Sequence, residues 1–562
     1  MCYNFKAMTD PLLPGAPGSL SPGAPGVDTP GRQDVELRSL AFADVDTAKR
    51  WARGLPVQNV GLVCETVLAQ LKALAAASFP PRERATIAEV LRELIAHLHT
   101  ELARRYAGKG QPPDDRELDA AEQAIALWQG LWEQYSTCLK PLLEGDPDLQ
   151  GVKPKILQRG LYVGKQLVLA HGLARRAVPG NIWHELHAYY RLAEMLECAV
   201  TSVSDNLLPN AVGISCYSTY SHALLMGLAD PYAMSVRQIE LTDRWLAMWA
   251  RKVFPYAQQR ETEGPIILID LDGGAPAALV PSAPPDTVPS MRFGYPGKLA
   301  TSVRGRLKRL QSGANPAELQ LGNDCSLEQC TTLLGHLDAR WYQLQRRRSS
   351  APEATVELCA GGIPAAYFRV SGHTFDCKDP AGRLSFAEAQ QLHAIAAVKE
   401  YDRGRENAEA SWAWERWHGT CEPREALVVR ESDPVHRWML DQLAIVKSED
   451  VVRVGYVTRV AMGGEGQLGA EGQLALTIRL WSARPVATTL LPLSAAASED
   501  PPLAALRLDE TPDDKPCLVL PPRTFNPSRV LRSLDTGPDR RYRLTRLLQR
   551  GIDFERVAFE ET

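Results

Sequence analysis

Alternation between two kinds of side chain in residues 452–480 is the feature that most constrains how this chain can fold. Over residues 452–460 every second position carries Val, Tyr or Thr, and over residues 474–480 every second position carries Leu or Ile. Side chains two residues apart lie on the same face of a strand, so each run predicts a strand with one buried face. The connection MGGEGQLGAEG is rich in glycine and contains EGQL twice, as expected of a hairpin tip lengthened where insertions cost little. The two runs therefore predict a β-hairpin.

Helical periodicity replaces this alternation in residues 44–262. Apolar residues between Ile87 and Leu102 recur three and four positions apart, which places them on one stripe of an amphipathic helix. Proline-containing breaks divide the region into helices of ordinary length, so we expect an all-helical domain. Before it, residues 1–43 repeat Pro and Gly with few large apolar side chains, which predicts a disordered tail.

The rest of the chain is divided by composition. Residues 263–400 mix a short apolar strand, a proline-rich stretch at 273–290 read as a linker, and two helical patterns, and predict a mixed α+β module. Residues 401–562 are rich in strand patterns, the last at 554–559. The predicted fold class is therefore an α+β multidomain protein.

Charge and cysteine content limit the classes of function. The 63 Lys and Arg residues and the 67 Asp and Glu residues leave a net charge of −4, which argues against a nucleic-acid-binding protein. Neither a secretory leader nor a run of twenty apolar residues is present, so we expect no membrane insertion and a cytoplasmic location. The 11 cysteines lack the paired spacing of a zinc site, which predicts reduced thiols and no bound metal.

One motif favours an enzyme. The sequence IILIDLDGG ends an apolar strand on Asp270 and Asp272, the arrangement with which haloacid-dehalogenase-type phosphatases place two carboxylates beside Mg²⁺. The following residue is Gly274, and a proline-rich stretch stands where a crossover helix should begin. A strand that ends in a polar turn is the alternative interpretation, and we predict no catalytic residues.

The C-terminal region resembles a known family. The pattern W-x₁₁-V-x-E-S from Trp417 to Ser432, followed by VVRVGYVTRV and QLALTIRLW, is similar to degenerate PilZ domains of bacterial cyclic di-GMP signalling proteins. This resemblance implies that residues 401–562 form a PilZ-like antiparallel β-barrel. It also implies cyclic di-GMP as a ligand, with no other cofactor.

The resemblance also implies where the ligand would bind. The family turn D-x-S-x-x-G falls on residues 430–435, where only Ser432 matches. We take Arg430, Glu431, Ser432 and Arg437 as the candidate ligand-binding residues, because guanidinium groups pair well with phosphate. Two alternatives stay open for the barrel, a nucleotide-binding site and a ligand-free surface that docks a protein.

Together these observations predict a non-enzymatic, cytoplasmic regulatory or adaptor protein, with the helical domain binding a protein partner and cyclic di-GMP as the expected effector. The alternative from another class is an Mg²⁺-dependent phosphatase that uses Asp270 and Asp272.

Overall fold

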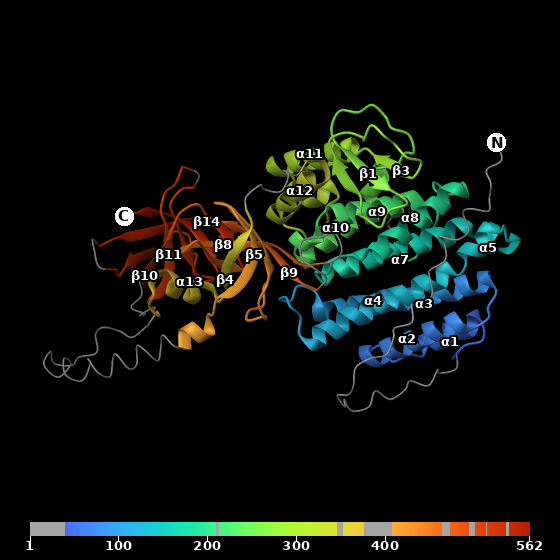
Figure 1. Ribbon diagram of the computed structural model, residues 1–562, viewed down its shortest axis with the longest axis horizontal. Helices are drawn as coiled ribbons and strands as arrows, with labels where there is room; N and C mark the ends of the chain where they lie inside the picture. The colour runs from blue at the N-terminus through green and yellow to red at the C-terminus, as the bar shows by residue number, and fades with distance from the viewer. Residues whose placement is uncertain are drawn as a thin grey trace.

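The computed structural model describes most of the chain, namely residues 40–208, 213–344, 352–375, 407–463, 472–493, 501–512, 514–535 and 539–562. Most of the predicted tail and the tip of the predicted hairpin lie outside these residues. A helical part and a pair of β-barrels lie at opposite ends of the molecule's long axis (Figure 1). The predicted α+β multidomain class is confirmed.

Among the described residues, ten α-helices lie in the region predicted to be helical. They are α1 Val45–Arg53, α2 Val60–Ala76, α3 Pro81–Tyr106, α4 Asp115–Ser136, α5 Leu139–Leu143, α6 Pro147–Gln150, α7 Lys153–Leu173, α8 Gly180–Met195, α9 Cys216–Leu228 and α10 Val236–Trp249. The predicted stripe on α3 faces the core, with Ile87 and Leu102 fully buried. Side chains cap several helices, as where Asp114 accepts from the Glu117 amide to begin α4. Apolar burial on α3, α4, α7 and α9 thus holds the array together.

A small sheet and two further helices pack onto this array. The sheet is antiparallel in the order β2-β1-β3, with β1 Ile266–Asp270, β2 Ala278–Val280 and β3 Met291–Gly294. The stretch predicted as a linker therefore contains a strand that pairs with β1. Helices α11 Gly297–Gln311 and α12 Leu327–Tyr342 share one hydrophobic core with α1 to α10, and the Trp341 indole donates to the Leu225 carbonyl at 2.9 Å. We therefore propose that the chain up to α12 is one folding unit, rather than two that meet at 262.

The remaining strands close into two barrels, where we expected one. Barrel 1 has the order β4-β5-β6-β9-β8-β7, and barrel 2 has the order β10-β11-β12-β15-β14-β13. The strands of barrel 1 are β4 Ala354–Cys359, β5 Glu415–Cys421, β6 Glu425–Arg430, β7 Leu443–Ser448, β8 Val451–Met462 and β9 Leu474–Leu480. Those of barrel 2 are β10 Pro485–Leu493, β11 Leu503–Leu508, β12 Cys517–Leu520, β13 Val530–Ser533, β14 Arg541–Arg550 and β15 Glu555–Glu561.

This arrangement corrects the expected extent of the barrel as well as the number. Barrel 1 needs β4, which lies before residue 401 and pairs with both β5 and β7. The acidic, proline-rich sequence between residues 494 and 516 contains β11, which pairs with β10 and β12. The predicted hairpin is confirmed as β8 and β9, with a register shift between Val457 and Arg459. The predicted last strand is confirmed as β15.

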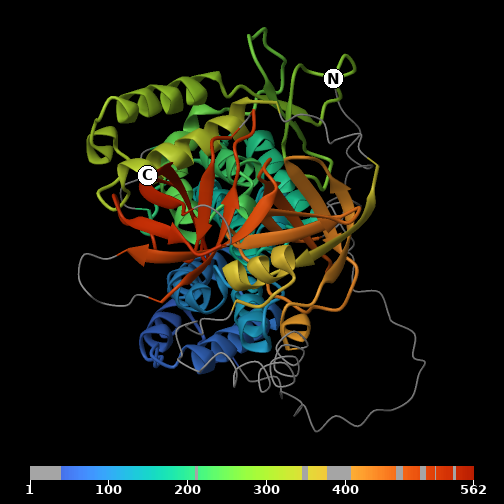
Figure 2. The same ribbon diagram turned by 90° about the vertical axis from the view of Figure 1, so that its left-hand side faces the viewer.

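The two barrels lie side by side in front of the helices when viewed along the long axis (Figure 2). Backbone bonds join them directly, since the Ile552 amide donates to the Asp441 carbonyl at 2.9 Å. Helix α13 Gly362–Ser371 covers the junction by packing against β7, β10 and β11. In the described part of the chain, no helix has the length and apolarity needed to cross a membrane.

Candidate functional site

The predicted ligand turn follows β6 and surrounds a buried carboxylate, Glu415. Glu415 is 1% exposed and accepts the Val435 and His436 amides, each at 2.6 Å. The Trp438 indole donates to the same carboxylate at 2.9 Å. The Arg430 guanidinium lies 3.3 Å from it and also donates to the His436 carbonyl at 2.8 Å. Glu415 therefore organises the turn from inside the barrel.

Arg430 is consequently part of the protein's interior. It is 7% exposed, and its guanidinium stacks on the Trp417 ring at 5.0 Å from the centroid. Burial lowers the pKa of Arg430, and the Glu415 charge opposes that effect. In this conformation the guanidinium pairs with Glu415 inside the barrel and does not face a ligand.

The other three candidate ligand-binding residues do not lie in one place. Arg437 points to the helical part, where it donates to the Gly110 carbonyl at 2.7 Å and pairs with Glu117. Ser432 stays on the barrel and accepts the amide of its neighbour Arg416 at 3.3 Å. Glu431 is exposed on the same surface. The structure thus brings Glu431 and Ser432 together and directs Arg430 inward and Arg437 across an interface.

That interface joins barrel 1 to the helical part at several points. Gln111 and Trp438 exchange backbone bonds, each of 2.8 Å. At the end of β8, the Met462 amide donates to the Arg175 carbonyl at 2.7 Å. The segment between β6 and β7 and the end of β8 therefore hold the helices by main-chain contacts.

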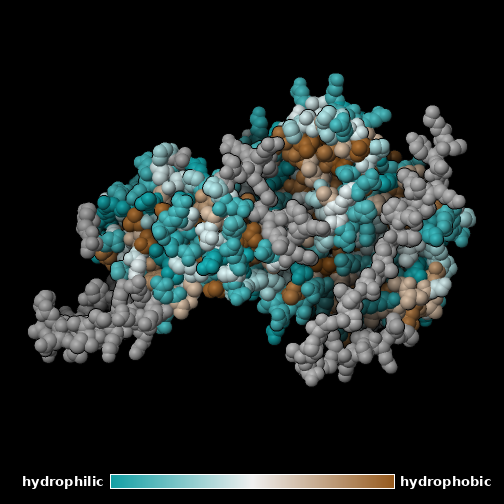
Figure 3. Space-filling model, viewed as in Figure 1, coloured by the Kyte–Doolittle hydropathy of each residue, from teal (hydrophilic) through white to brown (hydrophobic). Residues whose placement is uncertain are grey.

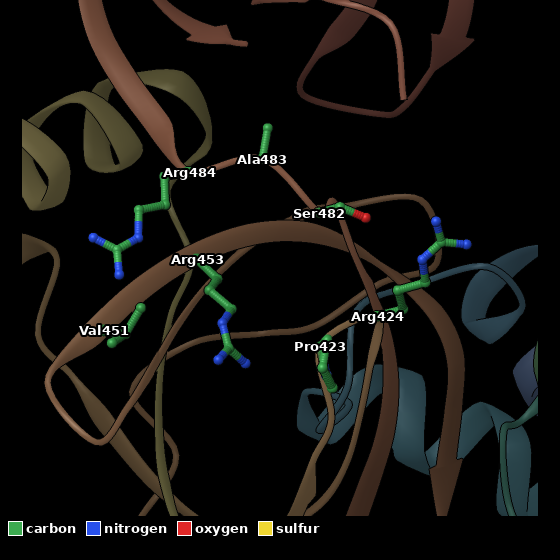
Figure 4. Close-up of a pocket in the computed structure, with 7 residues that line it drawn as sticks. All are labelled: Pro423, Arg424, Val451, Arg453, Ser482, Ala483 and Arg484. Carbon is green, nitrogen blue, oxygen red and sulfur yellow. The ribbon is translucent and has the colours of Figure 1, made fainter. Parts of the chain in front are cut away.

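A cavity lies at the end of barrel 1 opposite to the turn after β6, near the connection to barrel 2. Its volume is about 350 Å³. It is lined by the β5–β6 turn, the start of β8 and the β9–β10 connection, with the residues Pro423, Arg424, Val451, Arg453, Ser482, Ala483 and Arg484. Figure 4 shows Arg453 extending between Val451 and Pro423, with the other two arginines on either side. Sequence reasoning missed this cavity, because its arginines lie far apart along the chain.

A second cavity of about 560 Å³ lies where α13 meets both barrels. Its lining is mainly apolar, and one carboxylate, Asp553, faces it. Asp553 accepts the Leu443 amide at 2.8 Å, and burial raises its pKa to about 6. This carboxylate therefore links the two barrels.

The phosphatase alternative is not supported. Asp270 ends a strand of an antiparallel sheet, whereas the phosphatase motif needs a parallel sheet with crossover helices. Its carboxylate accepts from the Ser290 hydroxyl at 2.7 Å, and Asp272 pairs with Arg191. Both carboxylates stabilise the surface turn.

One pair of cysteines is oxidised, although the sequence predicted reduced thiols. Cys325 and Cys330 are joined by a disulfide, where we predicted free thiols. The nearby His336 donates to the Ala229 carbonyl at 2.8 Å and is thereby engaged. Among the described residues, no three His, Cys, Asp or Glu side chains gather as a metal site would require.

Comparison with known proteins adds a relationship that covers the helical part. Residues 46–256 match the family model described as the N-terminal domain of the cyclic-di-GMP receptor FimW. The cyclic-di-GMP receptor FimW of Pseudomonas aeruginosa is 23% identical over 382 residues, which are 67% of this chain and 60% of that protein. The chain thus spans 60% of the length of this relative. No solved structure matches the chain.

Proposed function

We propose that this protein is a non-enzymatic cyclic di-GMP effector of the cytoplasm. The observation that carries the proposal is the match of residues 46–256 to the N-terminal domain of a cyclic-di-GMP receptor. This range lies within α1 to α10 and the segment that follows them, so the similarity covers most of the helical array. A closed antiparallel barrel also follows the array, as the resemblance to PilZ domains requires.

The contacts between the parts support a regulatory role. Barrel 1 holds the helical part through Arg437 and through the end of β8, so a ligand-induced shift of the barrel would reach the helices. A protein partner would then bind the helical part. On the face seen in Figure 3, apolar residues gather near α11 and β1, whereas on the barrels they are scattered among hydrophilic ones.

Titration calorimetry of the full chain at physiological salt tests the proposal. We expect saturable heat with cyclic di-GMP and none with cyclic di-AMP at the same concentration, because a guanine edge presents a different donor and acceptor pattern from an adenine edge. Absence of binding, or equal binding of both dinucleotides, would contradict the proposal. A protein that binds neither would instead be an adaptor whose barrels only dock proteins.

A further inference from the structure

The arginine-lined cavity of barrel 1 has the shape and charge of an anion site. Arg424 comes from the β5–β6 turn, Arg453 from the start of β8 and Arg484 from the β9–β10 connection, and the fold brings them to one concavity of about 350 Å³. Arg453 is half-buried and Arg484 is exposed. A concave site with several cations lowers the free energy of a bound anion more than a flat surface does.

Two of these guanidinium groups have no protein carboxylate to neutralise them. In the part of the chain that the structure describes, Arg453 contacts the Cys421 sulfur at 3.7 Å, and no acid forms an ion pair with Arg453 or Arg484. Asp450, in the turn just before β8, pairs with Lys447 at 3.7 Å instead. This differs from Arg430 and Arg437, which both pair with glutamates. The cavity therefore holds positive charge that a ligand can neutralise.

Phosphate is the anion that this arrangement suits. Guanidinium groups pair bidentately with phosphate oxygens, and their flat faces also stack on nucleobases. Pro423, Val451 and Ala483 provide apolar walls beside the arginines, as a base would need. Nucleotides combine both kinds of group in one molecule.

From this geometry we infer that the cavity formed by Arg424, Arg453 and Arg484 binds the phosphates of the cyclic dinucleotide. The inference rests on the proposed function and places the ligand away from the turn after β6. Strand β6 separates the two locations, since Arg424 precedes its first residue and Glu431 follows its last. At about 3.4 Å per residue, they lie roughly 20 Å apart.

The location gives the ligand a direct effect on the second barrel. Ser482, Ala483 and Arg484 form the connection from β9 to β10, so a phosphate held by Arg453 and Arg484 would tie this connection to β8. The adjoining Trp481 amide already donates to the Val454 carbonyl at 3.1 Å, and its ring contacts Phe554 of barrel 2 at 5.5 Å between centroids. Binding at this cavity would therefore hold the β9–β10 connection, and with it the position of barrel 2 relative to barrel 1.

Calorimetry with cyclic di-GMP on full-length variants tests the inference. The double variant Arg453→Gln/Arg484→Gln keeps most of each side chain's length and removes two charges. We expect its affinity to fall at least tenfold, since one charge-assisted hydrogen bond contributes about that factor or more. The matched control is Arg540→Gln, which removes an exposed arginine from barrel 2 and should bind as the wild type does.

The outcomes separate the inference from the proposed function. If the wild type binds and the double variant binds equally well, while Ser432→Ala loses binding, the ligand occupies the turn after β6 and the inference is overturned. If the wild type does not bind cyclic di-GMP, the proposed function fails and the inference fails with it. Circular dichroism confirms that each variant is folded, and the single variant Arg484→Gln, at an exposed position, replaces the double variant if that one unfolds.

Discussion

Arg459 of β8 pairs with Asp230 of the helical part at 3.1 Å, across 229 residues of sequence. Asp230 also pairs with Arg340 of α12 at 2.8 Å, and the Arg459 guanidinium lies over the Tyr232 ring at 5.0 Å from its centroid. One carboxylate thus joins α12, the α9–α10 connection and barrel 1. Its side chain is 13% exposed, so water screens these pairs only in part.

Replacement of Asp230 by Asn should weaken this joint. The backbone of Asp230 has φ 55°, a conformation that Asn tolerates well, so the change removes charge without backbone strain. We expect the free energy of unfolding to fall by about 1–2 kcal/mol, because two arginines lose their common partner. Urea denaturation measures the loss. Asp539→Asn, which removes an exposed acid beside Arg541, should change stability by less than about 0.5 kcal/mol.

Loss of the Glu415 charge should lower the free energy of unfolding more than loss of the Asp230 charge. The variant Glu415→Gln leaves Arg430 buried without a counter-charge, which typically costs about 3–5 kcal/mol. The same denaturation experiment applies, with the exposed neighbour Glu431→Gln as control. A cost below about 1 kcal/mol would show that Arg430 finds water or another partner in the folded protein.

Asp553 should make stability depend on pH in an unusual direction. Its pKa is raised from 3.8 to about 6 by burial, so the folded protein binds a proton more tightly than the unfolded chain. The protonated carboxyl contributes stability that is fully present below pH 4 and is lost as pH rises to 6. The difference amounts to roughly 3 kcal/mol at most.

The test compares wild type with Asp553→Asn at several pH values. Burial lowers the pKa of His99 and of His171 to about 4, which destabilises the folded state as pH falls. Both proteins contain these histidines, so the difference between their free energies of unfolding at each pH does not include the histidine contribution. We expect the variant to gain stability relative to the wild type between pH 4 and pH 6. A flat difference would mean that Asp553 titrates normally.

Barrel 1 should require β4. A fragment of residues 352–562 contains both complete barrels, whereas a fragment of residues 401–562 lacks the strand that pairs with β5 and β7. We expect the longer fragment to unfold cooperatively and the shorter one to expose unpaired strand edges and aggregate. Size-exclusion chromatography and thermal unfolding distinguish them. Equal behaviour of the two fragments would show that β4 is dispensable.

Local periodicity predicted the elements whose pattern fits within one segment. The stripe on α3 and the β8–β9 hairpin are examples, because each buries one face and its sequence shows the period of that face. Barrel 2 was not predicted as a separate barrel. Its strands β12 and β13 have four residues each, too few to show a period.

The features that the sequence did not predict depend on contacts between residues far apart in the chain. Strand β4 ends at Cys359 and its partner β5 begins at Glu415, so no local pattern relates them. For the same reason, the sequence identified Arg430 as a ligand residue but did not show that Glu415 neutralises it. The arginines of the cavity recur at intervals of roughly thirty residues, and only closure of the barrel brings them together.

Strand β8 runs without interruption from the arginine cavity to the helical part. Arg453 lines the cavity near its first residue, while Arg459 and Met462 contact the helices near its last. Its first half pairs with β7 and its second half with β9, with a register shift between Val457 and Arg459, so the hydrogen-bonded ladder continues from one end of β8 to the other. A displacement of Arg453 by a bound anion would reach Asp230 through one strand, because Arg459 lies six residues further along β8, about 20 Å away.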